Sequence, residues 1–186
     1  MKTDTQTRKG RILKATIQHK TDDCADTDTL GQYKDTYSGV RDEWAIVRVG
    51  PHAGEFVYDL QDTEDWLPER SREFRFYYPP VGYYLGLDEK EMREYCLQDY
   101  ARMESLNRGD WYYVGVIAVA EITLPESTVI QRIRSGGLWG VESDAGEYFK
   151  EVEAEQLAEL AAELGKLGFG KRAIDYAIKN AAHKDA

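Results

Sequence analysis

The segment 111–124 is the most apolar strand expected in this chain. Successive side chains of a β-strand point to opposite faces, so the segment can be divided into two sets. Both sets are largely apolar: Tyr112, Val114, Val116, Ala118, Ala120 and Ile122 on one face, and Trp111, Tyr113, Gly115, Ile117 and Val119 on the other. A strand that is apolar on both faces lies inside a sheet and is covered on both sides. The sequence therefore predicts a sheet in which this segment is the central strand.

Shorter strands are expected around it, at 11–19, 44–49, 55–59, 74–78 and 128–134. Turn residues separate several of them, including Gly50-Pro51 before the third and Pro79-Pro80 after the fourth. The last strand follows the turn at 125–127 and is predicted to form a hairpin with the central strand. The polar stretch 20–41 has almost no aliphatic residues and is expected to be a long acidic loop.

Three helices are expected, at 88–107, 145–167 and 172–183. Asp88 with Glu91, and Asp144 with Glu147, have the spacing of capping boxes, and Gly109 is placed to end the first helix. These elements predict an α+β fold in which an antiparallel sheet is packed by two to three helices. The length of 186 residues suits a single domain over 1–186, with 1–10 expected to be flexible.

The charge of the chain restricts its partners. The formal net charge is −10 and the sequence pI is about 4.9. An acidic chain is unsuited to direct nucleic-acid binding or to docking on anionic lipid, because both need an excess of Lys and Arg. Two cysteines and a polar, basic N-terminus without an apolar region indicate no disulfide framework and no signal peptide. We therefore expect a cytoplasmic protein that has a basic partner and does not bind membranes.

The second helix segment, 145–167, carries a glutamate at every fourth position from 147 to 163. Four residues of α-helix advance about 6 Å and rotate about 400°, so these side chains form one slowly turning stripe. The stripe consists of Glu147, Glu151, Glu155, Glu159 and Glu163, with Glu142 and Asp144 extending it. Its spacing is close to that of phosphates along a nucleic-acid strand. Lys150 is the only lysine in the segment before Lys166, so few cations balance the stripe.

Two interpretations of the stripe remain open. Leu157, Leu160, Leu164, Leu167 and Phe149 fall on the other side of the helical wheel. An amphipathic helix places its charges away from its apolar side in any case, so the stripe fits a solvated face as well as a binding face. Tyr83 and Tyr84 allow the same two interpretations, as aromatic anchors of an interface or as rings packed over the sheet.

No residue pattern predicts catalysis, a metal ion or a cofactor. His19, His52 and His183 are far apart in the sequence and share no motif. Cys96 falls on the apolar face of its helix, where an inert buried thiol is expected. The turn at 135–137 is interpreted as packing beside a buried Trp139. Four aspartates crowd residues 22–28, but the calcium-loop pattern fails at its glycine and glutamate positions.

Several stretches carry a family resemblance. They are 98–104, leading to Arg108-Gly109-Asp110-Trp111; then 135–144, which contains Gly-Gly-Leu-Trp-Gly and leads into 151–157; and Gly168-Phe169. Over about 91–169 the chain resembles a family of small uncharacterised proteins encoded by phages and other mobile elements. The resemblance implies an accessory factor that acts on host machinery, and it assigns no catalytic residue.

Two functions of different classes are therefore expected. The first is a non-enzymatic inhibitor of a host nucleic-acid-handling complex, of the anti-CRISPR or anti-restriction type, whose acidic face mimics nucleic acid. The second is a small enzyme or ligand-binding protein whose site is assembled from distant residues. A convex acidic face favours the first, and a pocket with convergent polar groups favours the second.

Overall fold

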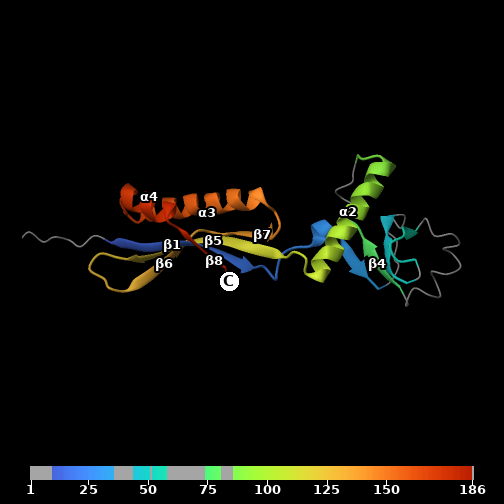
Figure 1. Ribbon diagram of the computed structural model, residues 1–186, viewed down its shortest axis with the longest axis horizontal. Helices are drawn as coiled ribbons and strands as arrows, with labels where there is room; N and C mark the ends of the chain where they lie inside the picture. The colour runs from blue at the N-terminus through green and yellow to red at the C-terminus, as the bar shows by residue number, and fades with distance from the viewer. Residues whose placement is uncertain (1–9, 36–43, 51, 58–73, 81–85, 186) are drawn as a thin grey trace, which may run out of the picture. The chain divides into compact units, whose positions relative to one another are not determined.

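The computed structural model describes residues 10–35, 44–50, 52–57, 74–80 and 86–185. Contacts within the chain gather into two compact units. Unit 1 contains Met1–Ala25 and Trp111–Ala186, and unit 2 contains Asp26–Asp110. Both combine helix and strand, which confirms the α+β class (Figure 1). One domain over the whole chain stays a prediction.

Strand β5, Tyr113–Thr123, lies inside the five-stranded sheet of unit 1, which confirms it as the central strand. Its neighbours are β1 (Arg11–Thr21) on one side, and β6 (Ile130–Arg134) and β7 (Leu138–Glu142) on the other, all antiparallel. The outermost strand, β8 (Ala182–Asp185), pairs with β1 in parallel. The predicted hairpin of β5 and β6 is therefore present.

Both faces of β5 are buried, as its sequence predicts. On one face Val116, Ala118 and Ile122 join the core formed with helices α3 (Glu147–Lys166) and α4 (Lys171–Lys179), which lie along that side of the sheet (Figure 1). On the other face Ile117 and Val119 are also buried. The ring of Trp139 lies against Gly115, where an added Cβ would be 2.3 Å from it. Trp139 is nevertheless 48% exposed, so the prediction of a buried tryptophan is wrong.

Two helix boundaries of unit 1 differ from the sequence prediction. Helix α3 starts at Glu147 behind Gly146 at the N-cap, and no side chain caps it. The predicted Asp144–Glu147 capping box is therefore absent, because Asp144 lies two residues before the cap. Helix α4 ends at Lys179, four residues before the predicted end. The residues that follow instead form β8, where pairing with β1 satisfies their backbone polar groups.

Unit 2 contains a three-stranded antiparallel sheet and one long helix. The strand order is β2 (Gln32–Lys34), β4 (Arg75–Tyr78) and β3 (Ile46–Val49). Strand β2 and a short 3₁₀ helix at Asp28–Leu30 lie in the stretch 20–41, so the prediction of one long loop there is wrong for its described part. In place of the predicted return strand at 55–59, the described residues 55–57 contain only an isolated antiparallel bridge between Ile46 and Phe56. Residues 58 and 59 lie outside the described ranges.

Helix α2 (Glu89–Arg108) confirms its sequence signals. Asp88 and Glu91 form the capping box, since the Asp88 side chain accepts from the Glu91 N–H while the Glu91 side chain accepts from the Asp88 N–H. Gly109 ends the helix in the left-handed conformation. Cys96 is fully buried, and burial raises the pKa of its thiol to about 12. Cys96 is therefore a protonated, inert thiol, as predicted from its place on the apolar face.

Candidate functional site

The glutamate stripe follows the outer face of α3. Its first four members, Glu147, Glu151, Glu155 and Glu159, are exposed, and Glu163 is partly exposed. The opposite face buries Val152, Gln156, Leu160 and Leu164. The helical wheel therefore places the carboxylates and the core correctly, except for Leu167, which caps the helix and is 49% exposed.

Cations are paired with the stripe at its two ends. Lys150 Nζ lies 2.7 Å from Glu147 Oε1, and Lys166 Nζ lies 2.6 Å from Glu163 Oε1. The sequence has no lysine or arginine from 151 to 165, and the structure pairs neither Glu151 nor Glu155 with any cation among the described residues. The centre of the stripe is thus its least neutralised part.

Glu159 has a second role that the sequence does not reveal. Its Oε1 accepts a hydrogen bond of 2.9 Å from the N–H of Gly136, in the connection between β6 and β7. The neighbouring Gly137 N–H donates to Gln156 Oε1 at 3.0 Å. These bonds fasten α3 to the sheet, so Glu159 supports the fold of unit 1 as well as the charge of the stripe.

Of the four remaining predicted binding residues, the structure describes two, Glu142 and Asp144. Glu142 is half-buried at the end of β7, and Asp144 is exposed in the turn before α3. Both therefore precede the stripe in unit 1. Tyr83 and Tyr84 lie outside the described residues, and their interpretation as anchors stays a prediction.

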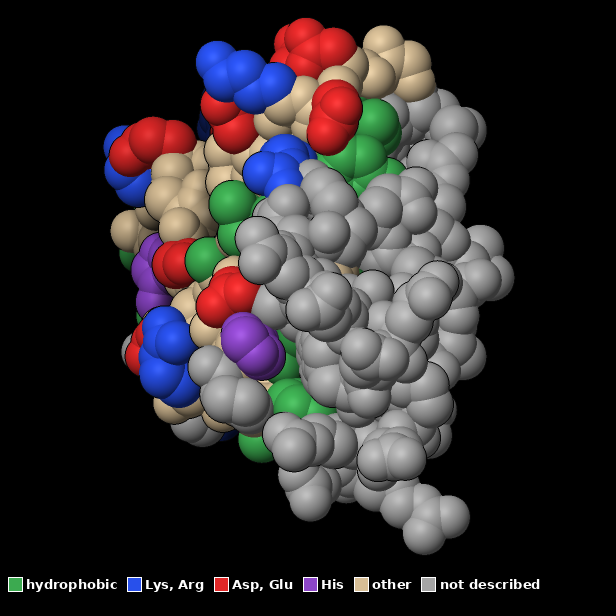
Figure 2. All heavy atoms as spheres, turned by 90° about the vertical axis from the view of Figure 1, so that its right-hand side faces the viewer, with side chains coloured by type: hydrophobic (Ala, Val, Ile, Leu, Met, Phe, Trp, Pro, Cys, Tyr) green, Lys and Arg blue, Asp and Glu red, His purple; other side chains and the backbone are tan. Residues whose placement is uncertain are grey.

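Opposite charges are mixed on the face of the molecule seen in Figure 2. There Asp and Glu side chains lie beside Lys and Arg side chains among the coloured residues. The stretch 151–159 on α3 contains four glutamates and no Lys or Arg.

Unit 1 also brings together a group that the sequence gives no sign of: His19 on β1, Glu153 on α3 and His183 on β8. His19 Nε2 lies 2.8 Å from Glu153 Oε1, and His183 Nδ1 lies 3.4 Å from the same oxygen. One ligand atom from each residue lies within 4.8 Å of the others, which is a spacing that could hold a metal ion. These two histidines share no sequence motif, and they lie together because β8 pairs with β1.

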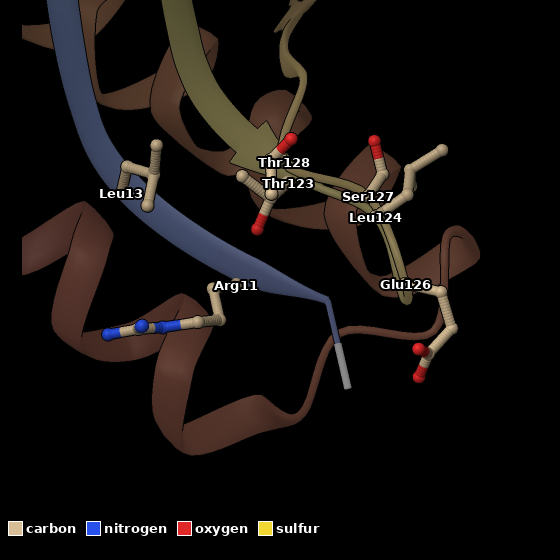
Figure 3. Close-up of a pocket in the computed structure, with 7 residues that line it drawn as sticks. All are labelled: Arg11, Leu13, Thr123, Leu124, Glu126, Ser127 and Thr128. Carbon is tan, nitrogen blue, oxygen red and sulfur yellow. The ribbon is translucent and has the colours of Figure 1, made fainter. Parts of the chain in front are cut away.

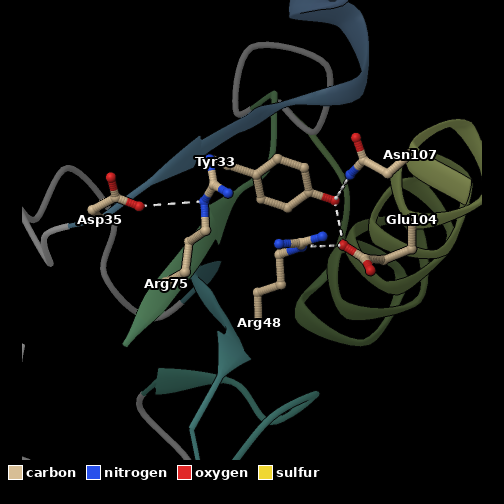
Figure 4. Close-up of polar contacts among 6 residues, drawn as sticks. All are labelled: Tyr33, Asp35, Arg48, Arg75, Glu104 and Asn107. Atoms are coloured by element: carbon tan, nitrogen blue, oxygen red, sulfur yellow. Dashed lines mark hydrogen bonds and ion pairs between the residues drawn. The ribbon is translucent and has the colours of Figure 1, made fainter. Parts of the chain in front are cut away.

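A polar network in unit 2 connects β2, β3 and α2 (Figure 4). The Tyr33 hydroxyl donates to Glu104 Oε1 at 2.5 Å, and Arg48 Nε donates to the same oxygen at 2.6 Å. Asn107 donates to the Tyr33 hydroxyl oxygen, while the Arg48 guanidinium lies 4.7 Å from the centre of the Tyr33 ring. These groups satisfy one another, so the network is interpreted as structural.

The network shifts the pKa values of its members in opposite directions. Burial, reinforced by the Glu104 carboxylate, raises the pKa of Tyr33 well above its ordinary value, so the phenol stays protonated. Burial alone would raise the pKa of Glu104 as well. The hydrogen bonds from Tyr33 and Arg48 and the charges of Arg48 and Arg108 outweigh it and hold this pKa below its ordinary value.

The lowered pKa of Glu104 predicts an acid-sensitive contribution to stability. A carboxyl whose pKa is lower in the folded state stabilises at neutral pH, and this contribution is lost as the pH falls through the folded pKa. Glu104→Gln is expected to lower the free energy of unfolding by about 1–3 kcal/mol at pH 7. The difference from wild type should shrink below about pH 4. Urea unfolding at several pH values measures both effects.

The matched control is Glu94→Gln on the same helix. Glu94 is 59% exposed, and Lys90 Nζ lies 3.8 Å from its Oε1. Its substitution should change stability by less than about 0.5 kcal/mol at any pH. Equal losses in the two variants would contradict a special role of Glu104.

A hollow of about 650 Å³ lies where β1 begins and β5 ends (Figure 3). Arg11 and Leu13 line it from β1, and the chain from Thr123 to Thr128 lines it from the other side. Its two charged side chains, Arg11 and Glu126, point in different directions. Because its polar groups do not converge, this hollow is a weaker candidate for a ligand site than the cluster around Glu153.

Two of the four aspartates at 22–28 accept hydrogen bonds from the chain's own backbone. Asp22 accepts from the N–H groups of Cys24 and Gly140, at 3.2 and 2.9 Å, and Asp26 accepts from the Asp28 N–H at 2.8 Å. Such bonds are typical of aspartates that shape turns. The contact with Gly140 additionally joins the end of β1 to β7.

Comparisons with protein-family models, with curated proteins and with solved structures find no match to this chain. Among the residues that the structure describes, no helix is long and apolar enough to cross a membrane. Function must therefore be inferred from the surface of α3 and the clustered side chains themselves.

Proposed function

We propose that this chain is a non-enzymatic binding protein that occupies a basic, nucleic-acid-binding surface of a host protein complex through the outer face of α3. A mobile-element inhibitor of the anti-CRISPR or anti-restriction type is the concrete form of this function. The single observation that carries it is the exposed centre of the stripe, where Glu151 and Glu155 have no cationic partner among the described residues.

Electrostatics explains why this surface suits a basic partner. Glutamates four residues apart on a helix repel one another, and each such pair costs a few tenths of a kcal/mol. A partner rich in Lys and Arg removes that repulsion on binding and replaces it by attraction. Because the carboxylates are exposed, the attraction acts chiefly on the association rate and is screened by salt.

The alternative is a protein whose activity depends on a site built from distant residues. The cluster of His19, Glu153 and His183 is the specific observation that favours it, since three separate segments supply its side chains. The two functions use different surfaces, because Glu153 lies off the stripe. They can therefore be tested separately.

Charge reversal at the centre of the stripe is expected to weaken partner binding about tenfold or more. The variant is Glu151→Lys with Glu155→Lys, which leaves the structural bond of Glu159 intact. Partners are captured from a bacterial lysate on the immobilised chain at low and at high salt, and DNA is added as competitor. Proteins bound by a nucleic-acid mimic should be lost at high salt, on addition of DNA, and with the reversed variant.

The matched control is Asp23→Lys with Asp175→Lys, which changes the net charge by the same amount on exposed residues of unit 1 away from the stripe. It should retain the partners. The proposal fails if the two double variants behave alike while both remain folded by circular dichroism. It also fails if added DNA leaves the captured proteins bound.

A further inference from the structure

Strand pairing brings two distant histidines to the same side of the sheet in unit 1. In the parallel ladder of β1 and β8, His183 lies opposite Ile17, and His19 follows Ile17 by two residues. Alternate residues of a strand share a face, and Ile17 belongs to the core beneath the helices. Both imidazoles therefore lie on the side that α3 covers, where Glu153 meets them.

The three side chains converge on one point. Glu153 Oε1 is 2.8 Å from His19 Nε2 and 3.4 Å from His183 Nδ1, so both rings direct a nitrogen to the same carboxylate oxygen. The centres of the two rings are 6.1 Å apart. Such convergence of two imidazoles and a carboxylate from three elements is the arrangement of a ligand set.

We propose that His19, Glu153 and His183 bind one divalent transition-metal ion, with zinc as its representative. Imidazole nitrogen suits zinc, copper, iron and nickel, whereas calcium and magnesium prefer oxygen ligands alone. Two histidines and one glutamate are a known donor set for zinc, with bonds of about 2.0–2.2 Å and a further position open to water. The ion replaces the present N···O contacts, and each binding nitrogen then carries no proton.

The surroundings suit such an ion. The side chains of His19 and Glu153 are only 23% and 16% exposed, so their interaction with an ion is less screened than at the open surface. The edge-on contact of Phe149, at 4.9 Å between ring centres, holds the His19 ring in place. His183 is 61% exposed, which leaves a path from solvent. The bound ion would fasten β8 to β1 and α3.

Titration with zinc chloride tests the site. The full chain without a histidine tag is treated with EDTA, dialysed, and titrated in a calorimeter, with calcium and magnesium chloride in parallel. Wild type should bind one zinc ion per chain and not respond to calcium or magnesium at the same concentrations. Saturating zinc should raise the melting temperature by about 5 °C or more.

His183→Ala is the informative variant because His183 is exposed and lies outside the core, so its truncation removes no core packing. Loss of this ligand should weaken zinc binding by at least about 10–100-fold. The matched control is His52→Ala, since His52 Nδ1 also lies 3.4 Å from a glutamate oxygen, that of Glu55, but without a second histidine. The control should bind zinc like wild type.

Glu153→Gln gives a second test that preserves the shape of the side chain and should also weaken zinc binding. The stripe variant Glu151→Lys with Glu155→Lys should retain it, which separates this site from the acidic face. The proposal is overturned if wild type takes up no zinc. It is equally overturned if calcium binds as well as zinc, or if His183→Ala and His52→Ala have the same affinity.

Discussion

Replacing Leu160 by alanine is expected to lower the free energy of unfolding of unit 1 by about 2–5 kcal/mol. Leu160 is fully buried on the inner face of α3 and packs in the core beneath the central strand. Removing its three terminal carbons loses their transfer free energy and leaves a cavity that the helix and sheet close only in part. Urea unfolding followed by circular dichroism measures the loss.

Leu167→Ala is the control for this substitution. Both leucines belong to the apolar side of the same helical wheel, but Leu167 is 49% exposed at the end of α3. Its truncation should cost less than about 1 kcal/mol, since little buried area is lost. Equal losses of stability in Leu160→Ala and Leu167→Ala would contradict the burial of Leu160 and the exposure of Leu167 at the end of α3.

Gly31→Ala is expected to destabilise unit 2 by about 2–5 kcal/mol, for two reasons that act together. Gly31 has φ 92° and ψ −169°, a backbone region that is essentially restricted to glycine. An added Cβ would also lie 2.4 Å from the carbonyl oxygen of Tyr78, a backbone atom of β4. Relief would require β2 and β4 to separate, and so would disturb Tyr33 and its network.

Gly54→Ala separates the two reasons. Gly54 has a similar φ of 89°, but a Cβ there would meet nothing within 4 Å. Gly54→Ala should therefore lower the free energy of unfolding only by the backbone strain of a non-glycine residue, about 1–2 kcal/mol. Thermal and urea unfolding measure the loss of stability in both variants. Equal losses would mean that the close approach of the added Cβ to the Tyr78 carbonyl does not destabilise unit 2.

Helix α3 carries three sets of side chains with different tasks. Leu160 and Leu164 fill the core, Glu151 and Glu155 form the exposed acidic centre, and Glu153 meets the two histidines. Because the sets are separate, a substitution in one leaves the others in place. The partner-capture and zinc experiments therefore test different side chains of the same helix.

Local signals explain most of what the sequence predicts correctly. The two apolar faces of 113–123 require a central, covered strand, and the capping box at Asp88 with Gly109 defines the ends of α2. The four-residue spacing of the stripe directs its glutamates outward once the leucines are buried. All these properties depend on neighbours within a turn or a strand, so they can be read along the chain.

The errors have a common cause in contacts between distant segments. Residues 182 and 183 fall within the helix predicted at 172–183, yet they belong to the segment 182–185 that pairs with β1, because the edge of β1 offers hydrogen bonds. Glu159 resembles the rest of the stripe, yet its carboxylate binds the Gly136 N–H. Trp139 resembles a core residue, yet it covers Gly115 with half its surface exposed.

The sequence by itself determined the α+β class, the central strand, the bounds of α2 and an acidic outer face on α3, because periodicity and caps act locally. Only the tertiary structure decided that His19 and His183 meet at Glu153. That meeting depends on the parallel pairing of two strands whose histidines are more than a hundred and sixty residues apart in the chain. Pairing over such a separation is set by the packing of the whole unit, and no local pattern encodes it.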